Sequence, residues 1–120
     1  MANDNLGKIS LSTILTAMNG RKDLVEEIVS LFLQQAPQDL LAITEALNKG
    51  ESEEIIRTTH HMKSTVSIFG ASNLSQILHE MEELGKSGKD LGKIKLLNLE
   101  LKKECGEAIE EIKSKINSNY

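Results

Sequence analysis

Residues 52–71 read SEEIIRTTHHMKSTVSIFGA, and their pattern is the strongest indication of the fold. Its apolar positions recur every three or four residues, as they do on the buried face of an α-helix. The stripe consists of Ile55, Thr59, Met62, Val66 and Phe69. Each residue turns by about 100° around a helix, so His60 falls well away from this stripe. The stretch therefore predicts an amphipathic helix, capped by Ser52, that buries one face and exposes a histidine.

The N-terminal part of the chain carries the same helical spacing. We expect residues 1–9 to form a frayed leader, and Ser10 or Ser12 to cap a short helix. A longer helical stretch is expected from about Lys22, with Pro37 breaking it, kinking it or starting a new helix at its first turn. Its expected apolar face holds Leu24, Val25, Ile28, Leu31 and Phe32, and then Leu40, Leu41, Ile43, Ala46 and Leu47.

The C-terminal part predicts two more helices. Gly70-Ala71-Ser72 is expected to turn the chain, with Ser72 as the N-cap of the next helix. Residues 85–88, GKSG, predict a loop, and the last helix is expected over about residues 90–115. The expected buried residues are Leu74, Ile77, Leu78, Met81 and Leu84, and then Ile94, Leu97, Leu101, Cys105, Ala108, Ile112 and Ile116.

These segments together predict the fold class. Long amphipathic helices joined by short loops pack as antiparallel neighbours, and no stretch alternates in the manner of a strand. We therefore expect an all-α protein: an up-down-up-down four-helix bundle with a short extra N-terminal helix. A chain of 120 residues is of one-domain length, and the expected domain covers residues 10–118.

Composition excludes several classes of function. The net charge of −4 and the lack of a basic stripe argue against non-specific binding of nucleic acid. The single cysteine, Cys105, excludes an internal disulfide and fits a reducing compartment. No apolar run approaches membrane-spanning length. We expect a cytoplasmic protein, or a cytoplasmic piece of a larger one, that is not inserted in a membrane.

The chemistry-bearing residues gather around His60. In a helix Lys63 lies beside His60, so an ammonium group is next to the imidazole. Ser64 is small, which leaves room for a partner surface to reach the ring. A histidine that titrates near neutral pH, with a neighbouring cation and open access, is suited to accepting and donating a phosphoryl group.

An ordered set of residues extends this pattern along the chain. It consists of His60, Met62, Lys63, Ser64, Ser67, Gly70, Ala71 and Leu74, then Met81-Glu82, preceded by Phe32-Leu33, Ala36-Pro37 and Leu40. The set closely resembles the histidine phosphotransfer (HPt) domains of bacterial phosphorelays, over most of residues 11–115. It departs from the family pattern at Met62, where leucine is usual, and at Ser64, where glycine is usual. Both replacements are conservative in size.

The resemblance implies a phosphorelay intermediate. His60 would take a phosphoryl group from the aspartyl phosphate of one receiver domain and pass it to the aspartate of another. Lys63 is implied beside the phosphoryl group and Glu82 beside the imidazole. Glu82 shares a helical stripe with His79, which is a weaker candidate for the same network. A carboxylate that accepts from Nδ1–H would leave Nε2 as the nucleophile.

The resemblance also implies the partners. These are the receiver domains of a hybrid sensor histidine kinase or of a response regulator, and the chain is expected to act as a monomer. The receiver would supply Mg²⁺, so we expect no cofactor, no metal and no enzyme activity of this chain alone; a Gly-rich loop for ATP is also missing. The expected docking residues around His60 are Ile56, Ser64, Ser67, Ile68 and Gly70.

Three other interpretations compete with this one. Adjacent histidines invite a metal site, but His60 and His61 diverge by about 100° on a helix and lack the spacing of a zinc helix. A domain phosphorylated directly by an ATP-bound kinase domain, as in chemotaxis kinases, is less favoured by the residues around Pro37. A plain helical adaptor, with an incidental histidine, stays open as the alternative from a different class.

Overall fold

The computed structural model describes residues 11–88 and 90–117, with side chains described over residues 14–88 and 90–114. The helices in these ranges are α1 (Leu11–Ala17), α2 (Lys22–Lys49), α3 (Ser52–Ile68), α4 (Ser72–Ser87) and α5 (Leu91–Asn117). No strand occurs among the described residues. The predicted leader, residues 1–9, and the predicted cap Ser10 lie outside them. Ser12 lies inside α1 and does not precede it.

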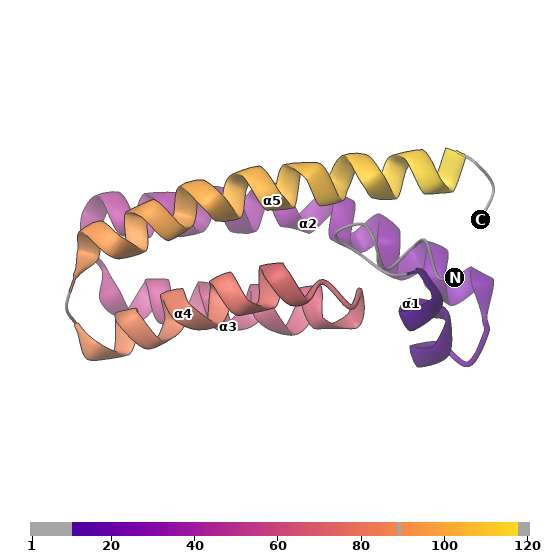
Figure 1. Ribbon diagram of the computed structural model, residues 1–120, viewed down its shortest axis with the longest axis horizontal. Coiled ribbons are helices and arrows are strands. Elements are labelled where there is room, and N and C mark those ends of the chain that lie inside the picture. The colour runs from indigo at the N-terminus through magenta and orange to yellow at the C-terminus, as the bar shows by residue number, and fades with distance from the viewer. Residues whose placement is uncertain (1–10, 89, 118–120) are drawn as a thin grey trace.

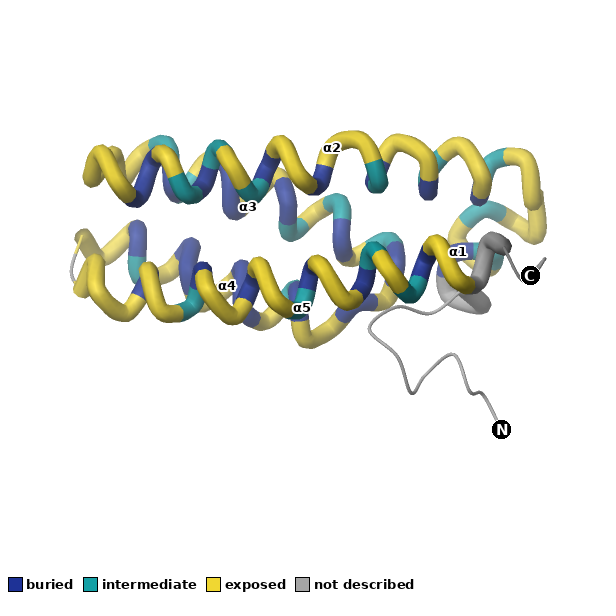
Figure 2. Tube along the Cα trace, turned by 90° about the horizontal axis from the view of Figure 1, so that it is seen from above, coloured by how far each residue is buried: buried dark blue, intermediate teal, exposed yellow. Residues whose placement is uncertain are grey.

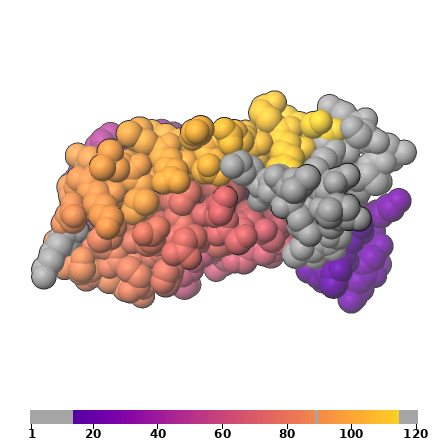
Figure 3. All heavy atoms as spheres, in the orientation of Figure 1, coloured from indigo at the N-terminus to yellow at the C-terminus, as the bar shows by residue number. Residues whose placement is uncertain are grey.

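Four of the helices form the predicted up-down-up-down bundle. The long helices α2 and α5 run side by side in opposite directions, and the hairpin of α3 and α4 covers them over part of their length (Figure 1). α1 is the predicted short extra helix, and it contacts α2 and α3. In the space-filling view α4 and α5 lie against each other on one face of the molecule (Figure 3). The expected all-α bundle is confirmed.

The core lies along the inner faces of the helices (Figure 2). The whole stripe predicted for the histidine helix is buried, from Ile55 to Phe69. The ring of Phe69 packs on Phe32 with centroids 4.7 Å apart, which joins the end of α3 to the middle of α2. The other fully buried large side chains are Ile14, Ile43, Leu74, Leu78, Met81, Leu101 and Ile112.

Part of the predicted α2 face was wrong. Leu31 is 55% exposed and Leu41 is 60% exposed, while Val29 and Ala36 are buried. The buried face follows Val25, Val29, Phe32 and Ala36, and Leu31 lies about 100° away from Phe32 on the helix. Ile116, expected in the core, lies outside the residues whose side chains are described.

Pro37 neither breaks α2 nor starts a new helix, because α2 runs without interruption from Lys22 to Lys49. A proline inside a helix cannot donate a hydrogen bond to the carbonyl four residues earlier. Pro37 itself is exposed, whereas Ala36 beside it packs into the core. Tertiary packing along the buried side of α2 therefore outweighs the missing hydrogen bond.

The helix starts of α3 and α4 and the end of α4 differ from the prediction. Ser52 and Ser72 are the first residues of α3 and α4, and the N-cap positions belong to Glu51 and Ala71, without a side-chain hydrogen bond. Residues 85–87, predicted as loop, continue α4. Gly85 is buried there, and a Cβ added to it would lie 3.0 Å from Cγ1 of Ile56 on α3. This glycine thus permits close approach of the two helices that carry the site.

Cys105 lies fully inside the bundle, as the sequence predicts. Burial, together with the nearby negative charge of Asp39, raises the pKa of its thiol to about 11. The thiol therefore stays protonated and unreactive at neutral pH. Within the described part of the chain, no helix has the length and apolar character needed to cross a membrane.

Candidate functional site

His60 and Glu82 meet across the interface of α3 and α4. Nδ1 of His60 lies 3.0 Å from Oε2 of Glu82, although the two residues are 22 positions apart in sequence. The side chain of His60 is 62% exposed, whereas that of Glu82 is only 5% exposed. The imidazole therefore offers its surface to solvent, while a buried carboxylate holds one of its nitrogens.

Lys63 contacts the other oxygen of the same carboxylate. Its Nζ lies 2.7 Å from Oε1 of Glu82, and its side chain is 25% exposed. Lys86, one turn along α4 from Glu82, approaches Oε2 to 3.6 Å. The buried carboxylate is thus surrounded by His60 and two ammonium groups. The hydrogen bonds from His60 and Lys63, with the charge of Lys86 nearby, offset the loss of hydration that burial imposes on a charged carboxylate.

These contacts determine the charge of Glu82. The hydrogen bond from Lys63 lowers the pKa of the Glu82 carboxyl, burial opposes this change, and the hydrogen bond with His60 adds to the lowering. The net direction is downward, so Glu82 is ionised at neutral pH and can only accept hydrogen bonds.

The ionised state of Glu82 selects the tautomer of a neutral His60. An acceptor at 3.0 Å from Nδ1 requires the proton on Nδ1. Nε2 then carries the lone pair of the ring, and the ring is mostly exposed. The geometry can therefore support nucleophilic attack by Nε2 on an electrophile brought by another molecule, with positive charge on the ring stabilised through Nδ1–H and Glu82.

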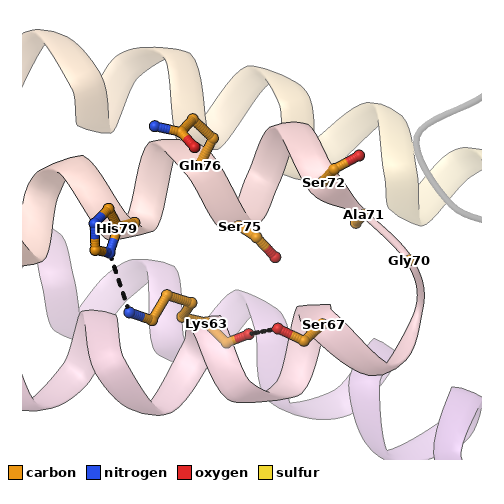
Figure 4. A pocket seen from close by; sticks show the side chains of 8 residues that line it. All are labelled: Lys63, Ser67, Gly70, Ala71, Ser72, Ser75, Gln76 and His79. Atoms are coloured by element: carbon orange, nitrogen blue, oxygen red, sulfur yellow. Dashed lines mark hydrogen bonds between the residues drawn. The ribbon is translucent and has the colours of Figure 1, made fainter.

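His79 lies on the other side of Lys63. Nδ1 of His79 is 3.4 Å from Nζ of Lys63 (Figure 4). Both residues line an open groove of about 510 Å³ between the end of α3 and the start of α4, together with Ser67, Ser75 and Gln76. In Figure 4 the side chains of Lys63 and His79 point toward each other from the two helices.

The expected docking residues differ in exposure. Ser64 and Ser67 are exposed, and their hydroxyls donate to the carbonyls of His60 and Lys63, at 3.3 and 2.8 Å. Gly70 is exposed and has a φ of 65°, a conformation that favours glycine. Ile56 and Ile68 are half-buried. All five residues lie on α3 or directly after it.

The adjacent histidine, His61, is exposed and takes no part in this network. Its side chain has no hydrogen bond or ion pair among the described residues. No group of three or more histidine, cysteine, aspartate or glutamate side chains placed to hold a metal ion occurs within the described ranges.

Glu82 lies in the stripe that the sequence predicts, but its burial was not predicted. A glutamate in a Glu-rich helix is usually expected to be solvated. The one indication of burial in the sequence is Gly85, which lies near Glu82 on α4 and allows α3 to approach. The contact of Lys86 with Glu82 has a signal in the sequence, the spacing of four residues on one helix.

Comparisons with known proteins agree with this fold. The family model described as Hpt domain matches residues 27–115. The crystal structure of histidine-containing phosphotransfer protein B from Pseudomonas aeruginosa PAO1 is similar, with a TM-score of 0.85 and 18% sequence identity, over 94% of this chain and 97% of that one. At this identity the likeness concerns the fold alone. A comparison with curated protein sequences gives no match.

Proposed function

The chain belongs to the Hpt domain family, whose role is histidine phosphotransfer in phosphorelays, and we propose that His60 carries the phosphoryl group between two receiver domains. The observation that supports this assignment most directly is the hydrogen bond of the exposed His60 ring to the buried Glu82. His61, the neighbouring candidate, has no such partner among the described residues.

In the proposed reaction Nε2 of His60 attacks the phosphorus of a receiver's aspartyl phosphate. The N–P bond forms as the P–O bond to the aspartate breaks, and the aspartate leaves as a carboxylate. Such transfer is in-line, with a loose, metaphosphate-like transition state. The charge that develops on the imidazole is stabilised by Glu82 through Nδ1–H. Transfer to a second receiver reverses these bonds on that receiver's aspartate.

Lys63 has the role of an electrostatic partner of the phosphoryl group on His60. Its ammonium lies between the two helices and binds Glu82 at 2.7 Å, and it is one helical turn from His60, within reach of a phosphoryl oxygen. Magnesium, which phosphoryl transfer needs, would come with the receiver. The chain then contributes a nucleophile, a cation and a docking surface, and it has no catalytic activity alone.

The docking surface surrounds His60. Ser64 and Ser67 are small and exposed, and Ile56 and Ile68 contribute partly exposed apolar surface on the same helix. A transient partner needs only a modest interface of this type, below the area of a stable complex. We propose that this surface, with Gly70, receives the receiver domain and places its aspartate opposite Nε2.

The test is transfer of radiolabel from a phosphorylated receiver. Wild-type protein and His61→Gln should both acquire an acid-labile, alkali-stable label, and His60→Gln should acquire none. Label on His60→Gln at the wild-type rate would disprove the assignment. Absence of label on the wild type with every receiver tested would favour the helical adaptor, and label only from an ATP-bound kinase domain would favour the chemotaxis type.

A further inference from the structure

His79 is the second histidine in contact with the phosphotransfer network, and it touches Lys63 and not His60. Its Nδ1 lies 3.4 Å from Nζ of Lys63, whose other contact is Oε1 of Glu82 at 2.7 Å. His79 and Glu82 are three residues apart, so they lie on the same face of α4. The Lys63 ammonium therefore sits between two acceptors presented by one helix.

The contact with His79 limits how many N–H groups of the Lys63 ammonium remain for another ligand. A lysine ammonium has three N–H donors and cannot accept a hydrogen bond. One is directed to Glu82 and one to His79, which leaves a single N–H for a third oxygen. Two contacts also restrict the rotation of a long, flexible side chain, so less side-chain entropy has to be lost when the ligand arrives.

We propose that His79 is a positioning residue for phosphotransfer, which holds the Lys63 ammonium by accepting its N–H at Nδ1 and so directs the remaining N–H toward the phosphoryl group on His60. This inference rests on the proposed function of His60 and Lys63. It requires neutral His79 with its proton on Nε2, because a protonated Nδ1 cannot accept.

The position of His79 suits a role of this kind. The residue is exposed, in contrast to the buried Leu78 next to it, so removing its ring leaves the core of the bundle intact. It also lines the groove from α4, directly across from Lys63 on α3 (Figure 4). A change in transfer on mutation of His79 can then be separated from a change in folding.

The first test detects the contact between His79 and Lys63 directly and does not depend on phosphotransfer. Nitrogen-15 NMR at about pH 8, above the range in which histidines take up a proton, reports the tautomer of each ring. We expect His79 to populate the Nε2–H tautomer more fully than the exposed His61 of the same molecule, and Lys63→Met to remove that difference. Equal tautomer populations of His79 in wild type and Lys63→Met would overturn the proposal.

The second test measures phosphotransfer. The two quantities are the maximal rate of transfer from a phosphorylated receiver and the receiver concentration at half-maximal rate. His79→Leu, which cannot accept, should lower the maximal rate about two- to tenfold, the effect of one hydrogen bond. His79→Asn, whose Oδ1 is an acceptor near the position of Nδ1, should restore most of the rate. His61→Leu is the matched control and should transfer at the wild-type rate.

Each other outcome of the second test contradicts the proposal. Equal slowing by the leucine and asparagine variants would indicate a steric role, and a change confined to the half-maximal receiver concentration would indicate a docking contact. Unchanged transfer by His79→Leu would show that Lys63 needs no such support. If wild-type protein accepts no label, the proposed function fails, while the tautomer measurement still decides whether His79 binds Lys63.

Discussion

Nδ1 of His60 and Oε2 of Glu82 lie 3.0 Å apart, with the histidine open to solvent and the glutamate buried between α3 and α4. The difference in exposure assigns a different task to each residue. The ring stays accessible to a partner, whereas the group that orients it is shielded from water. A shielded carboxylate interacts more strongly with its donors than an exposed one, because water screens it less.

The first prediction concerns the tautomer of His60. In wild-type protein at about pH 8, the neutral ring should carry its proton on Nδ1, since Glu82 can only accept. Replacing the carboxylate in Glu82→Met removes the acceptor and should shift His60 toward the tautomer mixture of His61. Nitrogen-15 NMR of the ring nitrogens measures both residues in one sample. Unchanged His60 populations in the variant would mean that Glu82 does not orient the ring.

The second prediction follows from the lowered pKa of Glu82. The usual value of such a carboxyl is 4.5, and in the folded protein the pKa is below it, mainly through the hydrogen bond from Lys63. A lowered folded pKa adds stability that is complete above the unfolded value and disappears as the pH falls through the folded one. The excess unfolding free energy of wild type over Glu82→Gln should therefore shrink below about pH 4.5.

Urea unfolding over a series of pH values provides the measurement. Glu54→Gln is the matched control, because Glu54 also pairs with a cation, Arg57, but faces solvent. Its effect should be smaller, since water screens an exposed pair. A wild-type advantage over Glu82→Gln that stays constant down to about pH 3 would be inconsistent with a stabilising ionised Glu82.

The third prediction concerns Lys63. Lys63→Met leaves the buried carboxylate of Glu82 without its closest cation, and should cost about 1–3 kcal/mol of unfolding free energy. Transfer to His60 should slow by about ten- to a hundredfold, because a charge-assisted contact to the phosphoryl group is lost. Lys86→Met, which removes a more distant and more exposed cation, is the control and should change both quantities less. Equal effects of the two variants would contradict a special role for Lys63.

The fourth prediction compares two helical glycines. A Cβ on Gly85 would meet Cγ1 of Ile56 at 3.0 Å, whereas a Cβ on Gly106 would meet nothing within 4 Å. Gly106→Ala should therefore stabilise the protein by about 0.5–1 kcal/mol through helix propensity. Gly85→Ala should destabilise it by about 1 kcal/mol, because α3 and α4 must move apart. Thermal or urea unfolding measures both.

The Gly85 prediction has an internal check. Ile56→Ala removes the atom that the new methyl group would meet, so Gly85→Ala should be harmless or favourable in that background. A Gly85→Ala protein as stable as Gly106→Ala would show that Ile56 moves aside at little cost.

Local patterns in the sequence predicted much of this molecule. The spacing of Ile55, Met62 and Val66 indicated both the buried face of α3 and the exposure of His60, because the turn of a helix converts sequence spacing directly into direction. Repetition of such faces with short connections predicted the bundle. The relation of Lys63 to His60 is also local, one turn along the same helix.

Other features depended on which helices face each other. Leu31 is as apolar as its buried neighbours, and only the packing of α2 leaves it outside. The composition of residues 85–87 predicted a loop, but α4 continues to Ser87, with Gly85 buried against α3. Packing along α2 likewise accompanies a helix that continues through Pro37. Local propensity is a weak preference, and long-range burial of apolar surface overrides it.

The site divides in the same way. Helical periodicity was enough to predict that an exposed histidine and a lysine share one face of a helix. The burial of Glu82 beside both of them, and the contact of His79 with Lys63, depend on the packing of α3 against α4, because these contacts join residues 16 to 22 positions apart. Helical periodicity says where a side chain points from its own axis, whereas the packing of a second helix determines what it meets there.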